Sequence, residues 1–376
     1  MSLKQHKNII RNLNAFEKLL PKTIDLSNLV IQDIDFTKTT INWGEFIYNN
    51  TTFLGCKFNR EDVSTIVNKG GYVYPKFKNI PYKPYRQSLY TWEELMEGYD
   101  PTEDNSIDLH IYNHFVKNKY TPSINEALAQ RIHDHSIDDA LRQLLGYDEN
   151  GMTQKKAVGF MGGHGTPRGD EFYIKAAFSA KLATENGYYV VSGGGPGIME
   201  AANLGAYFAH RADEDLKKAI TILAEAPKYT DQGFIQKAMD VLDLYPNGEE
   251  SLAIPTWFYG HEPSNLFASN IAKYFSNSIR EDTLLAISLY GVVYAPGSAG
   301  TTQEIFQEAA QNHYGTFGYY SPMVFLSKKR YVEDTSIYSV LHQLAKGKDY
   351  KQLLYLTDDP ELVVNFLKEH PPIKVK

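Results

Sequence analysis

The sequence predicts an α/β protein. Its main body is expected to be a Rossmann-like, doubly wound parallel sheet of about seven strands, preceded by an N-terminal region with a short pentapeptide-repeat-like segment and helices. From about residue 151 onward, apolar runs alternate with segments of helical period. Three glycine clusters each follow one of these apolar runs. Residues 24–58 instead repeat apolar side chains every five positions.

Length and composition exclude several classes of protein. The 376 residues favour two or three domains, at roughly 150 residues per domain. The net charge of −7 argues against non-specific nucleic-acid binding, which needs clustered Lys and Arg. The single cysteine, Cys56, excludes an intrachain disulfide. The sequence shows no signal-peptide pattern and no apolar run long enough to cross a bilayer, so we expect a cytoplasmic protein without membrane partners.

The N-terminal region, residues 1–150, shows no strand–helix alternation. Its five-residue period is carried by Leu26, Ile31, Phe36, Ile41 and Phe46 and, after a shift of two, by Tyr48, Phe53 and Phe58. This period fits neither a helix nor a simple strand and favours a short solenoid coil, with an irregular strand-and-turn segment as the alternative. We expect residues 61–104 to be irregular and residues 105–146 to be helical.

One stretch of the helical segment is rich in histidine and aspartate. His133, His135, Asp138 and Asp139 lie in the sequence HDHSIDD. Helical spacing would bring His135 near the aspartates, an arrangement that can bind a metal. We favour the alternative of a solvated helix face, so no metal site is expected.

Residues 151–376 are expected to form the nucleotide-binding catalytic domain. The expected strands are 157–161, 188–192, 251–257, 291–295, 322–326 and 353–356. The expected helices are 170–186, 196–209, 264–288, 301–311, one ending at 347, and 359–370, with a helical insertion at 212–246. Such alternation specifies a parallel sheet covered on both faces, with ligands at the carboxyl ends of its strands.

The glycine clusters indicate a ligand that carries phosphate. Their sequences are MGGHG at 161–165, SGGGPGIME at 192–200 and PGSAGTTQE at 296–304. Glycine lets the backbone approach a ligand, and a helix that begins after the loop offers free N–H groups to an anion. Neither GxGxxG nor GxxxxGK[ST] fits these loops, which disfavours an ordinary dehydrogenase or a P-loop NTPase.

Two of these clusters carry a family resemblance. GGGPGIMEAAN at 193–203 and PGSAGTTQE together resemble the LOG family of phosphoribohydrolases, also labelled lysine decarboxylase-like. The family motif PGGxGTxxE is matched except that Ser298 replaces the second glycine. NSIRE at 277–281 resembles the family's arginine helix. Glu262-Pro263-x-Asn265 is similar to a segment of the longer bacterial nucleotide 5′-monophosphate nucleosidases, and the whole resemblance covers about residues 151–370.

The resemblance implies an activity. Members of the family hydrolyse the N-glycosidic bond of nucleoside 5′-monophosphates to free base and ribose 5-phosphate, as homo-oligomers, dimers or larger, and without a metal or other cofactor. A non-catalytic nucleotide sensor on the same fold is the alternative. A third hypothesis is an assembly module that uses the pentapeptide-like segment as its docking surface.

Glu304 and Arg280 are the candidate catalytic residues. A carboxylate near C1′ can stabilise the positive charge that develops on the ribose or activate water. Arg280 could bind phosphate bidentately or orient Glu304, and a surface arginine is the alternative. Thr301-x-x-Glu304 is also a capping box, in which both side chains only satisfy backbone donors.

The candidate nucleotide- and phosphate-binding residues lie in or near the three loops. They are Gly162, Gly163, His164, Gly193, Gly194, Gly195, Gly197, Met199, Glu200, Glu262, Asn265, Gly297, Ser298, Gly300, Thr301 and Thr302. Three of them have a plainer alternative. His164 could hydrogen-bond the backbone, Glu200 could complement a helix dipole, and Met199 could belong to the core.

Overall fold

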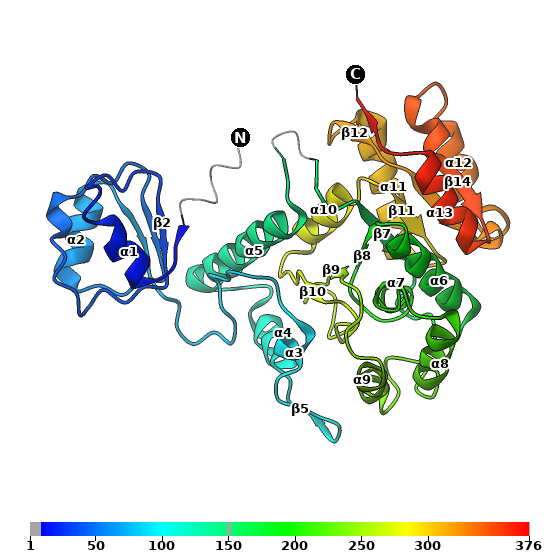
Figure 1. The fold of residues 1–376 in the computed structure, drawn as a ribbon, viewed down its shortest axis with the longest axis horizontal. Coiled ribbons are helices and arrows are strands. Elements are labelled where there is room, and N and C mark those ends of the chain that lie inside the picture. The colour runs from blue at the N-terminus through cyan, green and yellow to red at the C-terminus, as the bar shows by residue number, and fades with distance from the viewer. Residues whose placement is uncertain (1–8, 149–151, 376) are drawn as a thin grey trace. The chain divides into compact units, whose positions relative to one another are not determined.

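The computed structural model describes residues 9–148 and 152–375 (Figure 1). The chain divides into two compact units. The smaller comprises residues up to 87, 118–136 and 147–152, and the larger comprises 88–117, 137–146 and 153–376. Residues 88–117 and 137–146 therefore belong to the larger unit, although the sequence predicts a separate N-terminal region that extends to residue 150.

The smaller unit contains a parallel β-solenoid. Its strands pair in the order β1 (Ile9–Ile10), β2 (Val30–Gln32), β3 (Thr52–Leu54) and β4 (Tyr72–Tyr74), all parallel. Val30 lies opposite Thr52, and isolated bridges join Asp25 to Ile47 and Asp35 to Lys57. Asp35 and Lys57 are 22 residues apart, which matches four five-residue sides plus the observed shift of two.

The apolar residues of the five-residue period point into this coil. Leu26, Ile31, Phe36 and Phe53 have no exposed surface. Trp43 packs among the rings with its centroid 5.7 Å from that of Phe53. Each coil stacks on the next, so its buried side chains gain a core that one coil alone would lack. The predicted pentapeptide-repeat-like coil is confirmed.

Two helices complete the coil. They are α1 (Leu13–Leu19) and α2 (Arg60–Asn68). The prediction of irregular structure from residue 61 is wrong at its start, because α2 and β4 continue the solenoid there. Glu61 and Asp62 in the first turn of α2 favour a helix N-terminus, and Ile66 buries its side chain in the core.

The predicted helices of residues 105–146 are present as α4 (Ile107–Asn118) and α5 (Ile124–Leu145). His133 and Asp134 are buried and contact each other, with 3.1 Å between Nδ1 and Oδ1. His135 is exposed, whereas Asp138 accepts a hydrogen bond from Tyr274. The solvated-face interpretation is therefore wrong for His133 and Asp134, which face the interior of the fold.

The larger unit holds a seven-stranded sheet in the order β10-β9-β8-β7-β11-β13-β14, with every pairing parallel. The strands are β7 (Ala157–Met161), β8 (Tyr189–Ser192), β9 (Leu252–Ala253), β10 (Asn270–Ile271), β11 (Val292–Tyr294), β13 (Met323–Leu326) and β14 (Leu354–Thr357). The chain builds outward from β7 in one direction and then returns to add β11 on the other side. This doubly wound order confirms the predicted fold class and places a topological switch point beside β7.

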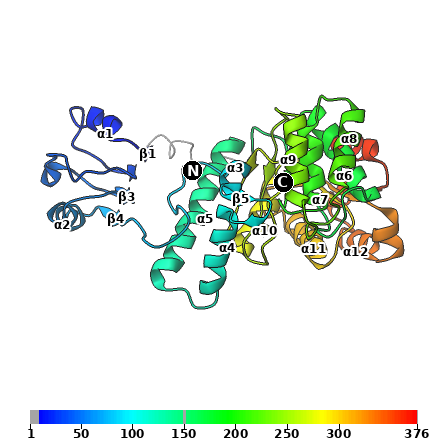
Figure 2. The ribbon, with the colours of Figure 1, turned by 90° about the horizontal axis from the view of Figure 1, so that it is seen from below.

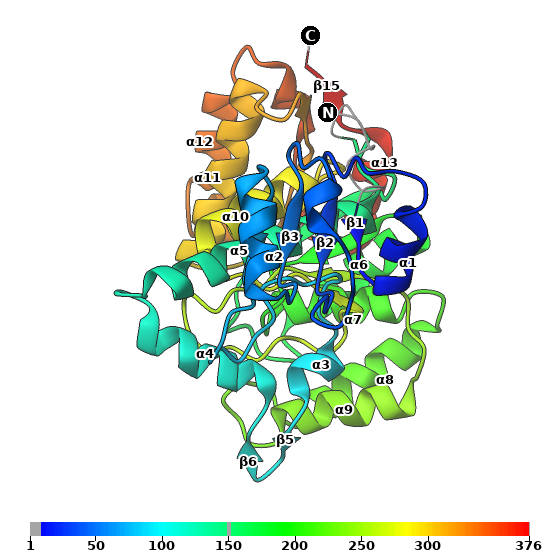
Figure 3. The ribbon, with the colours of Figure 1, turned by 90° about the vertical axis from the view of Figure 1, so that its left-hand side faces the viewer.

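Helices cover both faces of this sheet. Besides α4 and the C-terminal part of α5, the helices of the larger unit include α3 (Trp92–Met96), α6 (Glu171–Glu185), α7 (Ile198–Tyr207), α8 (Asp213–Leu223), α9 (Phe234–Leu244), α10 (Asn277–Ile287), α11 (Ala299–Tyr314), α12 (Ile337–Leu344) and α13 (Pro360–Glu369), with a π-helical turn η3 (Lys329–Glu333). In Figure 3, α10, α11 and α12 gather on one side and α6 and α13 on the other. Short strands also pair as β5 (Tyr99–Asp100) with β6 (Glu103–Asp104) and β12 (Tyr319–Tyr320) with β15 (Ile373–Lys374).

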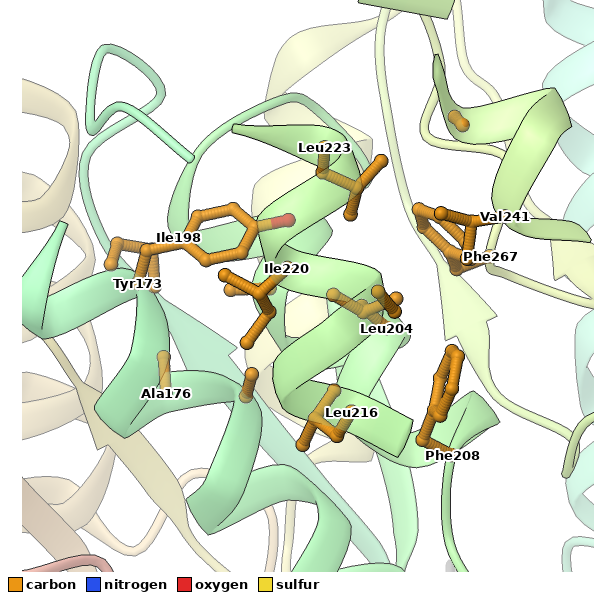
Figure 4. Close-up of a cluster of buried hydrophobic side chains, with 14 of the residues drawn as sticks. Tyr173, Ala176, Ile198, Leu204, Phe208, Leu216, Ile220, Leu223, Val241 and Phe267 are labelled. Atoms are coloured by element: carbon orange, nitrogen blue, oxygen red, sulfur yellow. The ribbon is translucent and has the colours of Figure 1, made fainter. Parts of the chain in front are cut away.

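The predicted helical insertion at 212–246 consists of α8 and α9, which lie beside α6 and α7 (Figure 2). Leu216 and Ile220 of α8 and Val241 of α9 meet Leu204 of α7 in one buried cluster, shown in Figure 4. Their apolar side chains recur at helical spacing, so each helix buries one face. This cluster holds the insertion against α6 and α7, and α7 begins at the second glycine loop.

The predicted helix over 264–288 is wrong in its first half, since α10 begins only at Asn277. Residues 270–271 instead form β10, which pairs with β9 on one side. On its other side, Ile271 exchanges backbone hydrogen bonds with Tyr90. Backbone hydrogen bonds on both sides hold this segment in an extended conformation. Its pairing with distant segments therefore overrides the helical periodicity of its apolar residues.

The solenoid core gives a stability prediction. Replacing Phe53 with Ala should destabilise the smaller unit by about 3–5 kcal/mol, because the ring is fully buried among aromatic neighbours. Hydrogen–deuterium exchange over residues 24–58 measures this loss as faster exchange. Ile47→Ala is the matched control, because the Ile47 side chain is 44% exposed on the same coil. Equal exchange in Phe53→Ala and the control would contradict the assigned core.

Candidate functional site

The three glycine loops meet at one edge of the sheet. They follow β7, β8 and β11, which are the strands around the switch point. Their backbones are joined directly: Gly163 N–H donates to the Pro296 carbonyl at 2.9 Å, and Ile198 N–H donates to the Gly163 carbonyl at 3.2 Å. The three loops therefore form one hydrogen-bonded rim, as the strand order requires.

Two positions in this rim require glycine, because neighbouring groups lie too close to leave room for a side chain. Gly197 has φ +69°, and a Cβ there would lie 2.7 Å from the His164 carbonyl oxygen. A Cβ on Gly193 would lie 2.5 Å from the Met199 sulfur and nearer still to the Arg280 guanidinium. The second loop thus needs glycine so that the first loop and Arg280 can come close.

A cavity of about 420 Å³ opens inside the rim. Twelve of the predicted site residues line it: Gly162, Gly163, His164, Gly193, Gly195, Met199, Glu262, Arg280, Ser298, Gly300, Thr301 and Glu304. A volume of this size falls in the range of small-molecule sites. The structure therefore brings residues from five separate segments of the chain into one site.

The other predicted binding residues do not line this cavity. Glu200 is buried in a bidentate ion pair with Arg168, which donates from Nε to Oε2 at 2.8 Å, and it also accepts from the Tyr173 hydroxyl. Arg168 donates further to the Phe234 carbonyl at the start of α9. Glu200 therefore links α7 to the helical insertion.

Five more predicted residues, Gly194, Gly197, Asn265, Gly297 and Thr302, support the loops from outside the cavity. Asn265 N–H donates to the Gly194 carbonyl, and its side-chain amide donates to Asn203. The Gly297 carbonyl accepts from Arg330 at 2.7 Å. Thr302 donates back to the Ser298 carbonyl. Gly197 makes the tight entry into α7 described above.

Arg280 donates hydrogen bonds to three groups at the site. It projects from α10 and is only 8% exposed. Its Nε donates to the Ile254 carbonyl at 2.8 Å, its Nη2 to the Gly193 carbonyl at 3.3 Å, and its Nη1 to Glu304 Oε1 at 3.2 Å. The guanidinium thus joins the ends of β8 and β9 to α11.

Glu304 is a largely buried carboxylate whose pKa lies above its ordinary value. Burial raises its pKa, whereas the charge and hydrogen bond of Arg280 lower it and the charge of Glu281 raises it again. Its Oε1 bonds Arg280 and not a backbone N–H. Helix α11 begins at Ala299 with Ser298 as N-cap, so Thr301 is not in the capping position. The capping-box interpretation of Glu304 is therefore wrong.

The N-terminus of α11 faces the cavity. Ser298, Ala299, Gly300 and Thr301 line it, and Ser298 makes no side-chain capping bond. The first N–H groups of a helix have no partner within the helix and carry the positive end of its dipole. This end of the cavity can accept a phosphate through backbone donors.

Eight further cavity residues were not predicted: Met161, Pro255, Thr256, Tyr259, Gly260, Glu281, Ala299 and Gln303. Most belong to the loop after β9 or lie beside predicted residues. The strand-end rule that located the glycine loops also applies to β9, so the segment from Pro255 to Gly260 carried a usable signal.

Glu281 and its partners form a polar wall of the cavity. Glu281 Oε1 accepts from the Asn277 amide at 2.7 Å and from the Tyr259 hydroxyl at 3.4 Å. Its Oε2 accepts from the Gln303 amide at 2.7 Å. On another part of the lining, His164 Nε2 lies 4.0 Å from Glu262 Oε1. The cavity thus holds three carboxylates, and one arginine among its lining residues.

The described residues hold neither a metal cluster nor a membrane-spanning helix. Over residues 9–148 and 152–375, no cluster of three or more His, Cys, Asp or Glu side chains is arranged to hold a metal ion. In the same part of the chain, no helix combines the length and apolar character needed to cross a membrane.

No family model and no curated protein matches the sequence of this chain. Among solved structures, the molybdenum cofactor binding protein of Rippkaea orientalis is 16% identical with a TM-score of 0.38, over 57% of this chain and 97% of that one. The Moco carrier protein of Chlamydomonas reinhardtii is 16% identical with a TM-score of 0.35, over 58% and 100%. Similarity at this level says nothing about what this chain binds.

The Arg280–Glu304 pair predicts a shift in titration. Arg280→Gln should raise the pKa of Glu304 further, because the variant loses the positive charge that opposes the effect of burial. Carbon-13 NMR of the glutamate carboxyl groups in variant and parent measures the shift. An unchanged or lower pKa would show that Arg280 does not act on Glu304 electrostatically.

Glu308, one turn further along α11, predicts a pH dependence of stability. Burial raises its pKa to about 8, and its Oε2 has no hydrogen-bond partner among the described residues. Between the ordinary value of 4.5 and about 8, the folded chain holds this proton more tightly than the unfolded chain, so stability falls as pH rises through that window. Thermal melts at pH 5 and pH 8 should show a smaller loss in Glu308→Gln than in the parent. The exposed Glu333→Gln is the control, and equal losses in both variants would refute the assignment.

Proposed function

We propose that this chain hydrolyses the N-glycosidic bond of nucleoside 5′-monophosphates to free base and ribose 5-phosphate. The observation that carries the proposal is the Arg280–Glu304 ion pair, 3.2 Å long, in the wall of a cavity lined by three glycine loops and a helix N-terminus. The sequence resemblance to the LOG family supports the same reaction.

The proposed phosphate position is the N-terminus of α11. Backbone N–H groups of Ala299, Gly300 and Thr301 would receive the 5′-phosphate, aided by the helix dipole. Three carboxylates line the cavity, so a dianion needs this cluster of donors to overcome their repulsion. The remote phosphate would thereby supply binding energy that holds the ribose at the reacting position.

Glu304 lies in the second turn of α11, one turn beyond the proposed phosphate. There its carboxylate would face the ribose. As the C1′–N bond breaks, its electron pair leaves with the base and positive charge develops at C1′. Glu304 would stabilise that charge or accept a proton from the water that attacks C1′. The water supplies hydroxyl to the ribose, and its remaining proton goes to the base, by way of Glu304 where Glu304 accepts it.

Arg280 is proposed to position Glu304 and keep it ionised. Two backbone carbonyls hold the guanidinium, so its direction is fixed before substrate enters. Its charge opposes the effect of burial on the pKa of Glu304. Preorganised charge of this kind costs no reorganisation during the reaction.

The proposed reaction uses protein side chains and water, so we propose that it needs no metal and no organic cofactor. A nucleoside 5′-monophosphate is the proposed small-molecule partner. By the same resemblance we propose a homo-oligomer, and from the net charge and the apolar pattern of the sequence we propose a cytoplasmic enzyme without nucleic-acid or membrane partners.

Base release tests the role of Glu304. Glu304→Gln should lower the rate of base release from the preferred 5′-monophosphate by about 100-fold or more, because the isosteric amide can neither balance the ribose charge nor accept a proton. Chromatography of reactions with AMP, GMP, IMP, CMP, UMP and N6-prenylated AMP measures it. A parent protein that binds a nucleotide but releases no base would instead favour the non-catalytic sensor.

Substrate comparison tests the phosphate position. Adenosine should have a kcat/KM at least about tenfold below that of AMP, since it lacks the group that several N–H donors would bind. Steady-state kinetics with both substrates measure the ratio. If CMP or another nucleotide proves the better substrate, the matching nucleoside replaces adenosine. Comparable turnover of nucleoside and nucleotide would contradict the phosphate anchor.

A further inference from the structure

Tyr259 lines the cavity while most of its ring remains in solvent. It is 66% exposed and belongs to the segment after β9. Large aromatic rings are usually buried, and an exposed ring on a cavity wall marks a place where a ligand can cover it.

The backbone on the N-terminal side of Tyr259 is held firmly. Trp257 is 1% exposed, and its indole N–H donates to Asp108 at 2.7 Å. Its ring packs against Phe275 with 4.6 Å between centroids. The Thr256 hydroxyl donates to the Tyr274 carbonyl at 3.1 Å. The chain two residues before Tyr259 is therefore held in a fixed position.

The far end of the Tyr259 side chain is held as well. Its hydroxyl accepts from the Asn277 amide at 2.9 Å and donates to Glu281 at 3.4 Å. The Phe258 ring meets it edge-on at 5.4 Å. A ring fixed at both ends loses little conformational entropy when a flat ligand stacks on it, which favours binding.

The position of Tyr259 relative to α11 indicates what would stack there. Tyr259 bonds Glu281, which bonds Gln303 in the second turn of α11, beside Glu304. One helical turn rises about 5.4 Å, so this wall lies one turn beyond the proposed phosphate position. A ligand with phosphate at the first turn and C1′ at Glu304 would bring its next group, the base, toward Tyr259.

We propose that the ring of Tyr259 is the stacking platform of the nucleobase subsite. This inference rests on the proposed function and adds the residue that binds the base. Stacking requires only a planar face, so Tyr259 holds any aromatic base, and purines gain most because they cover more of the ring. The hydroxyl network with Asn277 and Glu281 sets the angle of the platform.

Calorimetric titration tests this subsite in the Glu304→Gln background, where bound AMP persists. Adding Tyr259→Ala should raise the Kd of AMP at least about fivefold, the loss typical of one base–aromatic stack. The Kd of ribose 5-phosphate, which has no base, should change less than about twofold. Tyr259→Phe keeps the ring and should lie between parent and Tyr259→Ala. Tyr314→Ala removes an 80% exposed tyrosine outside the cavity lining and should change neither constant.

The other results separate the failure of the subsite from the failure of the hydrolase. Equal weakening of AMP and ribose 5-phosphate would show that Tyr259 only supports the loop, and unchanged AMP binding would show that the ring carries no base. Failure of the background protein to bind AMP, GMP, IMP, CMP, UMP or N6-prenylated AMP would overturn the subsite and the hydrolase together, and the best-bound of these replaces AMP where AMP does not bind. Base-selective weakening in a protein whose parent releases no base would retain the subsite and reject only the hydrolase.

Discussion

The site depends on the position of one guanidinium. Arg280 joins the Ile254 and Gly193 carbonyls to Glu304, and so it connects the loops after β8 and β9 with α11. Neither partner carbonyl belongs to its own helix. A buried charge in such a position is stable only when hydrogen bonds surround it, so the loops and Arg280 require each other.

The same constraint explains the glycines. Gly193 has no side chain because Arg280 and Met199 occupy that space, and Gly197 turns the chain where the first loop passes close by. These glycines serve close backbone packing first. The lining of the cavity that results includes the free start of α11 and the Glu281–Gln303–Tyr259 network. These two parts of the lining differ in the chemistry that they offer a ligand.

Much of this arrangement could be predicted from sequence. The five-residue period identified the solenoid coil because one inward side chain per side is a local rule. The motif around Glu304 and the arginine at 280 placed the ion pair because strand-end loops converge in a parallel sheet. The β10 segment was missed because its structure comes from partners distant in sequence, Tyr90 and β9. Glu200 could not be distinguished from a ligand-binding carboxylate because its partner Arg168 is 32 residues away.

A crystal structure of the Glu304→Gln variant with bound AMP would show directly where the nucleotide binds. We expect the phosphate to bind the backbone N–H groups of Ala299, Gly300 and Thr301. We also expect C1′ to lie within about 4 Å of the side chain at position 304, the range in which that group can act on the reacting bond. A phosphate bound elsewhere, or C1′ directed away from position 304, would contradict the proposed phosphate site and the proposed role of Glu304.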